Sequence, residues 1–414
     1  MKKLGLVLCL VLVCLFAFGR KTKVEFWTIS LSPTFDNYIN SIIESYEEKN
    51  PNIEIEWSDV PYSAFMQKIT ASIAAGNAPD VINLNSEWML DLVGMEALSP
   101  IDDYISKVEK YRYLENLWEV GMVDGKTYSV PWYTTPNVLI YNKEIFEKSG
   151  LDPDSPPTTW EEVEEYCEKI KQNTDAYPLS TVTDGHQLLL TNGIPLVTKD
   201  GKKSAFNNSE ALELLEYYNR LYKKGYLPKD LGDYSSAVQR FSGNNLGMFV
   251  VGISQLKSIK QNNPSMVEKI GVSQLPLGKA KIIPVTPMNF TVPYNSKRKE
   301  EAVDFILWIT SGYWQVQFAK YATVLPSTKI SLDSDPYFKS MEDKDILIKG
   351  EIVGAKSLKY GTDLNTLHNI PADKYNSFRR TLNENYFIKA IKNEIEPEEA
   401  LKLAEIDCNK ILAN

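Results

Sequence analysis

Short strand-like runs alternate with longer helix-like patterns through the first 85 residues, and this alternation restricts the chain to an α/β fold. Residues 53–57 alternate apolar and acidic side chains with a period of two, and 24–28 and 80–84 are further strand-like runs. Between these runs, apolar residues recur at helical spacing over 36–49 and 64–75. The β-α-β-α-β order predicts a mainly parallel sheet that is covered by helices.

The rest of the chain continues in the same style with more helix. Thr159 and Glu162 have the spacing of a capping box, at the start of a helix that we expect to run to about residue 172. We find no internal repeat and no low-complexity linker, so we expect the domains to be joined by several short crossings. The remaining expected elements are helices over 209–224, 300–310 and 397–412, and strands over 138–141 and 247–251.

The first nineteen residues have the pattern of a secretory signal peptide. Two lysines precede an apolar run over 4–18, and Ala17 and Gly19 supply small side chains at the −3 and −1 positions of a cleavage site. The apolar run is too short to span a bilayer comfortably. We therefore expect an exported protein that begins near Arg20 after cleavage, in the periplasm or at the cell surface.

The four cysteines fall into two groups. Cys9 and Cys14 lie in the expected signal peptide, where a lipid anchor is the alternative; each follows a bulky residue, whereas a lipid-attachment site needs a small one. Cys167 and Cys408 lie on the apolar faces of expected helices, and we expect two buried thiols that pack as small hydrophobic groups. A disulfide between them is the alternative in an exported protein.

Length and charge restrict the chain further. Its 414 residues exceed what one hydrophobic core usually covers, so we expect two domains. The formal net charge is −9, and removal of residues 1–19 would make it −11, because two lysines and no acids are lost. Nucleic acid is therefore not an expected partner, since its phosphates require a basic surface.

The sequence offers no constellation that indicates catalysis. Its two histidines, His186 and His368, are far apart, and no group of His, Cys and acidic residues has metal-ligand spacing. No glycine-rich phosphate loop follows the first strand-like run, and no Gly-x-Ser-x-Gly motif occurs. We expect no catalytic residues, no metal and no cofactor, although two distant acids could still converge as in a glycoside hydrolase.

Six segments, in order along the chain, resemble the extracellular solute-binding proteins of the maltose-binding type. Each segment alone is a weak or moderate signal, but the resemblance covers essentially residues 23–412. The chain departs from the family at Trp132 and Tyr133, where small residues are usual. The six segments are GNAPDVINLN (76–85), VLIYNKEIFEKSGL (138–151), PTTWEEV (157–163), FSGNNLGM (241–248), LPS (325–327) and PEEALKLAE (397–405).

The resemblance implies a two-lobed periplasmic-binding-protein fold of type II, with a mainly parallel sheet and flanking helices in each lobe. We expect an N-terminal lobe of residues 20–130 plus 288–324 and a C-terminal lobe of 131–287 plus 325–414. The implied function is that of a monomeric substrate-binding component of an ABC importer. Such a protein captures a sugar or oligosaccharide between its lobes by hinge closure, and membrane permease subunits recognise the closed form. The lobes are expected to be joined by crossings near 131–138, 286–292 and 324–327.

Ligands of open α/β sheets lie beyond the carboxyl ends of the strands, which gives a first set of candidate ligand-binding residues. A sugar cleft needs aromatic planes for C–H faces and fixed donors and acceptors for hydroxyls, and Trp88 follows polar residues in one such loop. Core packing is the alternative for Trp27, as is packing under the next helix for Trp88. The candidates at strand ends are Trp27, Thr28, Ser30, Asn85, Glu87, Trp88, Gly252 and Ser254.

The first crossing contributes a second set. Trp132 and Tyr133 lie outside any clean periodicity, and the prolines at 131 and 136 would stiffen the backbone and present both rings to the cleft. The resemblance implies that Thr135 touches ligand. Met288 and Asn289 in the second crossing are expected to act as hinge, ligand contacts or both.

The second lobe supplies a third set. The resemblance places His186 where the family provides a stacking or hydrogen-bonding side chain, with Asp184 as its associated acceptor. Tyr375, near the start of a C-terminal helix, is a further candidate. A surface loop without function is the alternative for Asp184 and His186.

Two other functions stay open at this point. The same fold could bind a non-sugar solute such as a polyamine, a peptide or an organic phosphate. A secreted glycoside hydrolase is the third hypothesis. The strand-end loops contain no Arg or Lys before Lys257 for a phosphate, whereas Glu87 and Asp184 are compatible with a polyamine.

Overall fold

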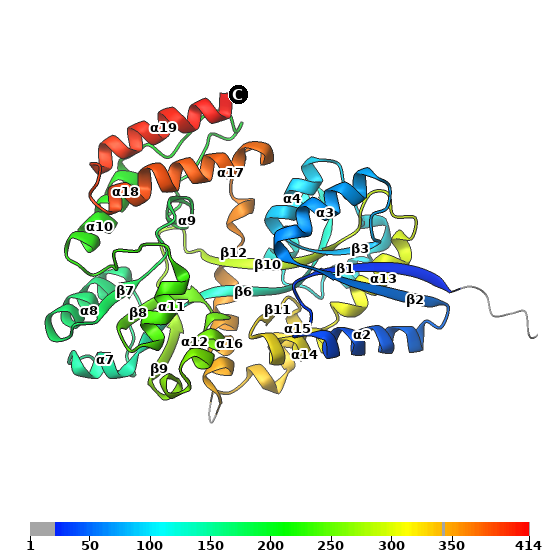
Figure 1. The fold of residues 1–414 in the computed structure, drawn as a ribbon, viewed down its shortest axis with the longest axis horizontal. Helices are drawn as coiled ribbons and strands as arrows, with labels where there is room; N and C mark the ends of the chain where they lie inside the picture. Colours follow the sequence, from blue (N-terminus) through cyan, green and yellow to red (C-terminus); the bar gives the residue numbers. More distant parts are fainter. Residues whose placement is uncertain (1–20, 342–343, 414) are drawn as a thin grey trace, which may run out of the picture.

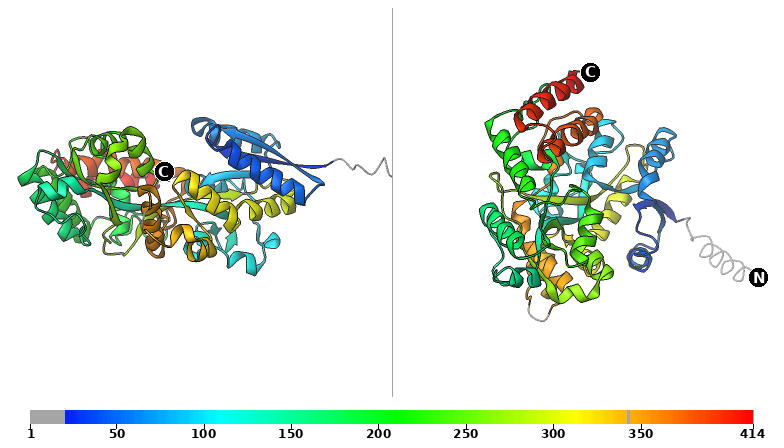
Figure 2. Two further views of the ribbon diagram at one scale, coloured as in Figure 1. Left: turned by 90° about the horizontal axis from the view of Figure 1, so that it is seen from below. Right: turned by 60° about the vertical axis from the view of Figure 1, so that its left-hand side comes forward.

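The computed structural model describes residues 21–341 and 344–413, and the expected signal peptide, with Cys9, Cys14 and Arg20, lies outside them. Figure 1 shows two α/β lobes side by side along the long axis, and the views of Figure 2 agree. The strands are β1 (Thr22–Ile29), β2 (Ile53–Val60), β3 (Val81–Asn85), β4 (Met122–Val123), β5 (Lys126–Thr127), β6 (Ser129–Asn142), β7 (Tyr177–Ser180), β8 (Leu246–Gly252), β9 (Ile270–Gln274), β10 (Ile283–Thr291), β11 (Leu325–Pro326) and β12 (Gly361–Thr362).

The helices surround these strands and agree closely with the periodicity of the sequence. Thr159 and Glu162 form the expected capping box at the start of α8. The helices are α2 (Asp36–Lys49), α3 (Tyr62–Ala74), α4 (Ser86–Gly94), α5 (Lys107–Lys110), α6 (Glu115–Glu119), α7 (Lys143–Lys148), α8 (Trp160–Asn173), α9 (Gly185–Thr191), α10 (Ser209–Lys223), α11 (Tyr234–Ser242), α12 (Gln255–Asn262), α13 (Lys299–Ile309), α14 (Gly312–Ala322), α15 (Lys329–Ser334), α16 (Ile346–Ser357), α17 (Ala372–Arg380), α18 (Ile388–Ile391) and α19 (Pro397–Ala413).

One continuous sheet runs through both lobes in the order β2-β1-β3-β10-β6-β8-β7. The pairs of β1 with β2 and β3 are parallel, as is the pair of β7 with β8. Strand β10 is antiparallel to β3 and β6, and β6 is antiparallel to β8 and β9. The sheet is therefore mixed, because β6 and β10 pass from one lobe to the other and pair with strands in both.

The stretch between Pro131 and Pro136 is part of a regular strand, contrary to the expectation of an aperiodic crossing. β6 extends without interruption over fourteen residues, and its first half pairs with β10, with one register shift between Met288 and Asn289. Proline fits an antiparallel strand where its nitrogen is not required as a donor. The strand therefore continues through both prolines, with a bulge that leaves Trp132 without a partner in the register.

Trp132 lies in the hydrophobic core, which corrects the prediction that its ring faces the cleft. Its side chain is fully buried and stacks on Phe318 at a centroid distance of 4.5 Å, with Phe290 at 4.8 Å. Trp132, Val130 and Phe290 belong to the same hydrophobic cluster. The Trp132 side chain therefore packs in an aromatic core and does not line the cleft.

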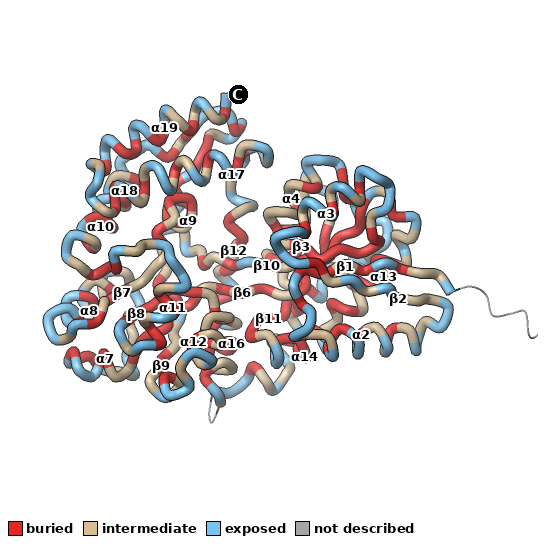
Figure 3. The backbone as a smooth tube through the Cα atoms, in the orientation of Figure 1, coloured by how far each residue is buried: buried red, intermediate tan, exposed pale blue. Residues whose placement is uncertain are grey.

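Hydrophobic clusters occupy both faces of the sheet, and buried residues follow the strands in Figure 3. Two clusters draw their members from the β1–β3 half, and a third packs under α8, α10 and α19 in the other half. Cys167 and Cys408 belong to this third cluster as free buried thiols, so the expected packing role is confirmed. The lobe limits drawn from the sequence stay a prediction.

A fourth cluster connects the two halves of the molecule. It includes Val316 and Ala319 of α14 together with Val138 and Ile140 of β6 and Leu325 of β11. These residues surround the segments where the chain passes between the lobes. Along residues 21–341 and 344–413, no helix combines the length and the apolar character that a membrane crossing requires.

Candidate functional site

The carboxyl ends of β1, β3, β7 and β8 lie between the lobes, and the helices that follow them begin there. In Figure 1, α3 and α4 lie on one side of this region, and α9 and α17 on the other, with β6 and β10 beneath. Residues of α17 contact α4, so the two lobes touch across the region. The strand-end rule used on the sequence thus leads to the interlobe surface.

A cavity of about 410 Å³ lies at the ends of β7 and β8 on the C-terminal side. Its walls include Thr181 and Asp184 after β7, Tyr234 at the start of α11, and Arg379 on α17. The ring of Tyr234 is 48% exposed, although it is a large aromatic group beside charged residues. An exposed ring next to fixed donors and acceptors is the combination that a sugar ring requires.

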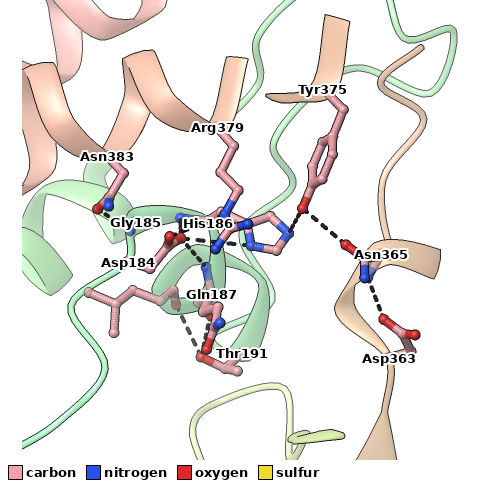
Figure 4. Close-up of polar contacts among 11 residues, drawn as sticks. Asp184, Gly185, His186, Gln187, Thr191, Asp363, Asn365, Tyr375, Arg379 and Asn383 are labelled. Atoms are coloured by element: carbon pink, nitrogen blue, oxygen red, sulfur yellow. Dashed lines mark hydrogen bonds and ion pairs between the residues drawn. The ribbon is translucent and has the colours of Figure 1, made fainter. Parts of the chain in front are cut away.

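Asp184 caps α9 and holds Arg379 at the same time (Figure 4). One carboxylate oxygen accepts hydrogen bonds from the backbone N–H groups of His186 and Gln187, at 3.0 and 3.4 Å. The other oxygen lies 3.2 Å from Nε of Arg379. Both oxygens are therefore engaged within the protein, and Arg379 presents its remaining N–H donors to the cavity that it lines.

His186 and Tyr375 form a buried pair behind Arg379. Nε2 of His186 lies 3.1 Å from the Tyr375 hydroxyl, which donates to Oδ1 of Asn365 at 3.1 Å. His368 stacks on the Tyr375 ring at 4.3 Å. Both His186 and Tyr375 are about 5% exposed, and Tyr375 also lines a cavity of about 590 Å³ together with Glu87, so direct ligand contact by these residues stays a prediction.

Burial controls the protonation of these histidines. Removal from water lowers the pKa of His186 to about 3, and the positive charge of Arg379 adds to this effect. Burial likewise lowers the pKa of His368 to about 3, with a smaller contribution from His186. Both rings are therefore neutral at physiological pH.

The network extends to the N-terminal lobe. Nδ2 of Asn365 donates to Oγ of Ser86, the first residue of α4, at 3.4 Å. Burial raises the pKa of Asp363, two residues before Asn365, to about 6, while a hydrogen bond from Ser86 opposes this shift. The charge of Glu87, also in the first turn of α4, acts on both Arg379 and Tyr375.

On the N-terminal side, two aromatic rings stack at the cleft. Tyr62, at the start of α3, is 58% exposed, and its ring centroid lies 4.5 Å from that of Trp88. Trp88 is also parallel to Phe65 at 5.9 Å. Asn85 caps α4 by accepting from the Trp88 backbone N–H at 2.8 Å, so Trp88 is held by both packing and a helix cap.

The other predicted residues of β1 divide between core and surface. Thr28 is fully buried and donates to Asp59 at 2.6 Å, so its hydroxyl is used inside the lobe. Ser30 is exposed, and its Oγ accepts from the Tyr62 backbone N–H at 2.9 Å. Trp27 is half-buried, with the Lys68 ammonium 4.2 Å from its ring centroid.

Candidates on the crossing strands and after β8 likewise differ in burial. Asn289 is fully buried in β10, and its role as hinge or ligand contact stays a prediction. Tyr133 packs against the same aromatic cluster as Trp132, but part of its surface stays exposed. The partly exposed candidates that stay predictions are Thr135, Met288, Gly252 and Ser254.

Sequence reasoning missed Tyr62, Tyr234, Arg379 and Asn365. Tyr62 follows β2 directly, so the strand-end rule would have found it if it had been applied to that strand. Tyr234 begins a helix after the capping residue Asp233, which is a local signal only for a helix start. Arg379 and Asn365 reach the site from distant segments and carry no local signal.

The family model for the bacterial extracellular solute-binding protein matches residues 32–312, more than half of the chain. The chain belongs to this family. Its two-lobed fold with a mixed central sheet is the periplasmic-binding-protein fold expected from the sequence. The family is described as extracellular. The individual proteins compared in the next paragraph are named for binding.

Three of these similar proteins are described by their identity and coverage. A Brucella abortus (strain 2308) protein, named for binding without a stated ligand, is 26% identical over 352 residues, which cover 82% of this chain and 84% of that protein. The sn-glycerol-3-phosphate-binding periplasmic protein UgpB of Escherichia coli (strain K12) is 24% identical over 261 residues, or 58% of each chain. The structure of a cyclic alpha-maltosyl-1,6-maltose binding protein from Arthrobacter globiformis is 22% identical, covers 95% of this chain and 99% of its own, and has a TM-score of 0.81.

Proposed function

We propose that this solute-binding protein is the substrate-binding component of an ABC importer and captures a sugar or oligosaccharide between its lobes. The observation that carries the proposal is the 410 Å³ cavity at the ends of β7 and β8, where the exposed Tyr234 ring lies beside Arg379 and Thr181. Its volume lies in the range of small-molecule sites. The ring supplies an apolar plane, and the guanidinium and hydroxyl supply hydrogen bonds to the edges of a sugar ring.

The opposite lobe supplies the second half of this site. Tyr62 is exposed at the start of α3 and its ring packs at a tilt against Trp88, so two aromatic rings lie together at this point of the lobe. A pyranose between Tyr62 and Tyr234 would bury an apolar face against each lobe on closure. This differential contact is what makes ligand binding shift the open–closed equilibrium.

Strands β6 and β10 are the natural hinge, because each pairs with strands of both lobes. A few residues in these strands absorb the rotation while the clusters on either side move as rigid bodies. In this proposal the protein is exported with cleavage of residues 1–19, acts as a monomer, does no chemistry and delivers ligand to permease subunits. Its acidic balance agrees with a ligand other than nucleic acid.

An organic phosphate is the second candidate ligand. Arg379 and Arg380 both line a surface hollow that adjoins the 410 Å³ cavity. One relative is named for binding glycerol phosphate. Asp184 already neutralises Arg379, and Glu384 lies in the same hollow, which lowers the attraction for a dianion. A sugar is therefore the first choice.

A ligand panel tests both candidates together. Thermal unfolding and small-angle X-ray scattering would be measured with maltose, maltotriose, cellobiose, xylobiose and glycerol 3-phosphate. A saccharide ligand raises Tm by mass action and reduces the radius of gyration. Tyr234→Ala is the matched control and should abolish both effects. Compaction with glycerol 3-phosphate alone would replace the sugar with a phosphate, and no response to any saccharide would overturn the proposal.

A further inference from the structure

A second and larger cavity, of about 770 Å³, lies within the C-terminal lobe. It shares Thr181, Val182, Gln187 and Val250 with the 410 Å³ cavity. Its other walls include the start of α8, α10 and the 275–282 segment between β9 and β10, none of which lines the 410 Å³ cavity. The two cavities therefore meet at β8, α9 and the β7–α9 loop, and each has further walls of its own.

The walls of this second cavity are mainly apolar and aromatic. Trp160, Tyr217 and Tyr360 contribute rings that are only partly buried by the neighbouring protein. Leu214 and Leu277 are likewise only partly covered where they line it. Ring faces and aliphatic side chains that enclose several hundred cubic ångströms are typical of a small-molecule site.

Two polar atoms among the walls lack a partner. Oε1 of Gln187 and Oγ of Ser273 are buried, and neither has a hydrogen-bond partner among the described residues. A buried oxygen without a partner costs free energy, which a ligand donor would recover. The position of these atoms calls for a ligand with an N–H or O–H group.

Charges at the exposed edge of the cavity select against anions. Glu161, Glu210 and Glu213 place three carboxylates there, against the single ammonium of Lys279, which lies 3.9 Å from Glu213. An anionic ligand would meet net negative charge on entry. A neutral or cationic molecule is favoured.

We infer that this cavity is a second ligand site, for a neutral or cationic aromatic molecule that carries a hydrogen-bond donor. Asn137 of β6 and Ile283 and Pro284 of β10 also line it. A bound molecule therefore touches both strands that pass between the lobes. Unless it binds the open and closed forms equally, it changes the affinity for the ligand held between the lobes, and the reverse change follows by linkage.

N-phenyl-1-naphthylamine is a suitable probe, because it is neutral, aromatic and carries one N–H donor, and its fluorescence rises in apolar surroundings. Titration into the full chain should give a saturable signal. Leu214→Trp fills the cavity and should weaken probe binding at least tenfold. Leu212→Trp is the matched control: Leu212 is also a partly buried leucine of α10 on the same core, outside the cavity wall, and its variant should bind like the parent.

Two further variants make the test specific. Ser273→Ala removes the hydroxyl without adding bulk to the cavity, so the dissociation constant should rise about two- to tenfold. Tyr234→Ala, in the 410 Å³ cavity, should leave probe binding unchanged while it abolishes the saccharide response, which separates failure of this site from failure of the proposed function. Hydrogen exchange should slow over residues 273–284. Equal binding by the Leu214→Trp and Leu212→Trp proteins, or a signal that does not saturate, would overturn the inference.

Discussion

The guanidinium Nε of Arg379 lies 3.2 Å from the carboxylate of Asp184, which is also the residue that caps α9. One carboxylate thus fixes both the start of α9 and the direction of Arg379. Both residues are part of the wall of the 410 Å³ cavity, which Tyr234 also lines. Changes at Asp184 should therefore affect helix stability and ligand binding in separable ways.

Asp184→Asn and Asp184→Ala separate these two roles. Asparagine keeps the cap and loses the charge, so the free energy of unfolding should change little while ligand affinity falls as Arg379 is released. Alanine loses the cap as well and should cost about 1 kcal/mol more. Urea unfolding gives the first quantity, and calorimetric titration with the most effective saccharide of the panel gives the second. Equal stability of the two variants would contradict the capping role.

Trp132→Ala should lower the free energy of unfolding, and any loss of ligand affinity should be a consequence of this destabilisation. Its indole is fully buried among Phe290 and Phe318, so truncation leaves a cavity, and large-to-small changes of this kind cost about 3–5 kcal/mol. Tyr234→Ala is the opposite case, because its ring is half-exposed and should cost less than about 1 kcal/mol. Chemical unfolding of both variants checks the contrast, and a stable Trp132→Ala protein that no longer binds ligand would return Trp132 to the cleft.

The histidine pair should make stability fall as the solution becomes acidic. The unfolded chain takes up a proton at each histidine near pH 6.5, whereas the folded protein keeps His186 and His368 neutral down to about pH 3. Between these values each histidine lowers the free energy of unfolding by about 1.4 kcal/mol per unit fall in pH. The pKa of Asp363, raised to about 6, acts in the opposite direction, so a variant must be compared with the parent at each pH.

His186→Gln isolates the contribution of one ring. The stability of the parent relative to this variant should decline as pH falls from 6.5 towards 4, and His368→Gln should behave in the same way. The groups that face His186 are Arg379, Tyr375 and His368, together with Asp184, whose oxygen lies 3.8 Å from Nδ1. A ring signal of His186 that titrates near pH 6.5 in NMR would rule out the expected window.

Local patterns predicted most of the fold because local physics determines it. The helix over 36–49 and the capping box of Thr159 and Glu162 depend on side chains within a few residues of each other, and both are present in the structure. The prediction that the Trp132 ring faces the cleft was wrong, because its surroundings depend on Phe290 and Phe318, which are far along the chain. Two flanking prolines looked like a break in periodicity, but the β6–β10 ladder maintains the strand through them.

The candidate site was predictable on the same terms. Asn85 and Trp88 follow a strand directly, and the rule for strand ends places them at the interlobe surface. Arg379 and Asn365 reach it from α17, which contacts α4, and from the 363–370 segment, both of which are far along the chain from that strand. Their roles depend on contacts with Asp184 and Ser86 that no local spacing encodes.

Glu351 should make the protein less stable as pH rises from about 4.5 to about 8. This carboxyl group on α16 is 1% exposed and accepts a hydrogen bond from the Tyr337 hydroxyl at 2.7 Å. Burial raises its pKa to about 8, against opposing hydrogen bonds from Tyr337 and the backbone of Val324 beside β11. Because the folded protein keeps a proton that the unfolded chain releases near pH 4.5, the free energy of unfolding falls by about 1.4 kcal/mol per unit between pH 4.5 and 8.

Glu351→Gln removes this titration while it keeps an uncharged group of the same shape. The variant should be close to the parent in stability at pH 5 and more stable at pH 9, as measured by guanidinium unfolding at both values. Glu48→Gln, at an exposed position on α2, is the control and should differ from the parent in stability by no more than about 0.5 kcal/mol at either pH. A Glu351→Gln protein that is less stable than the parent at pH 9 would mean that the buried carboxylate is ionised and stabilised by its neighbours.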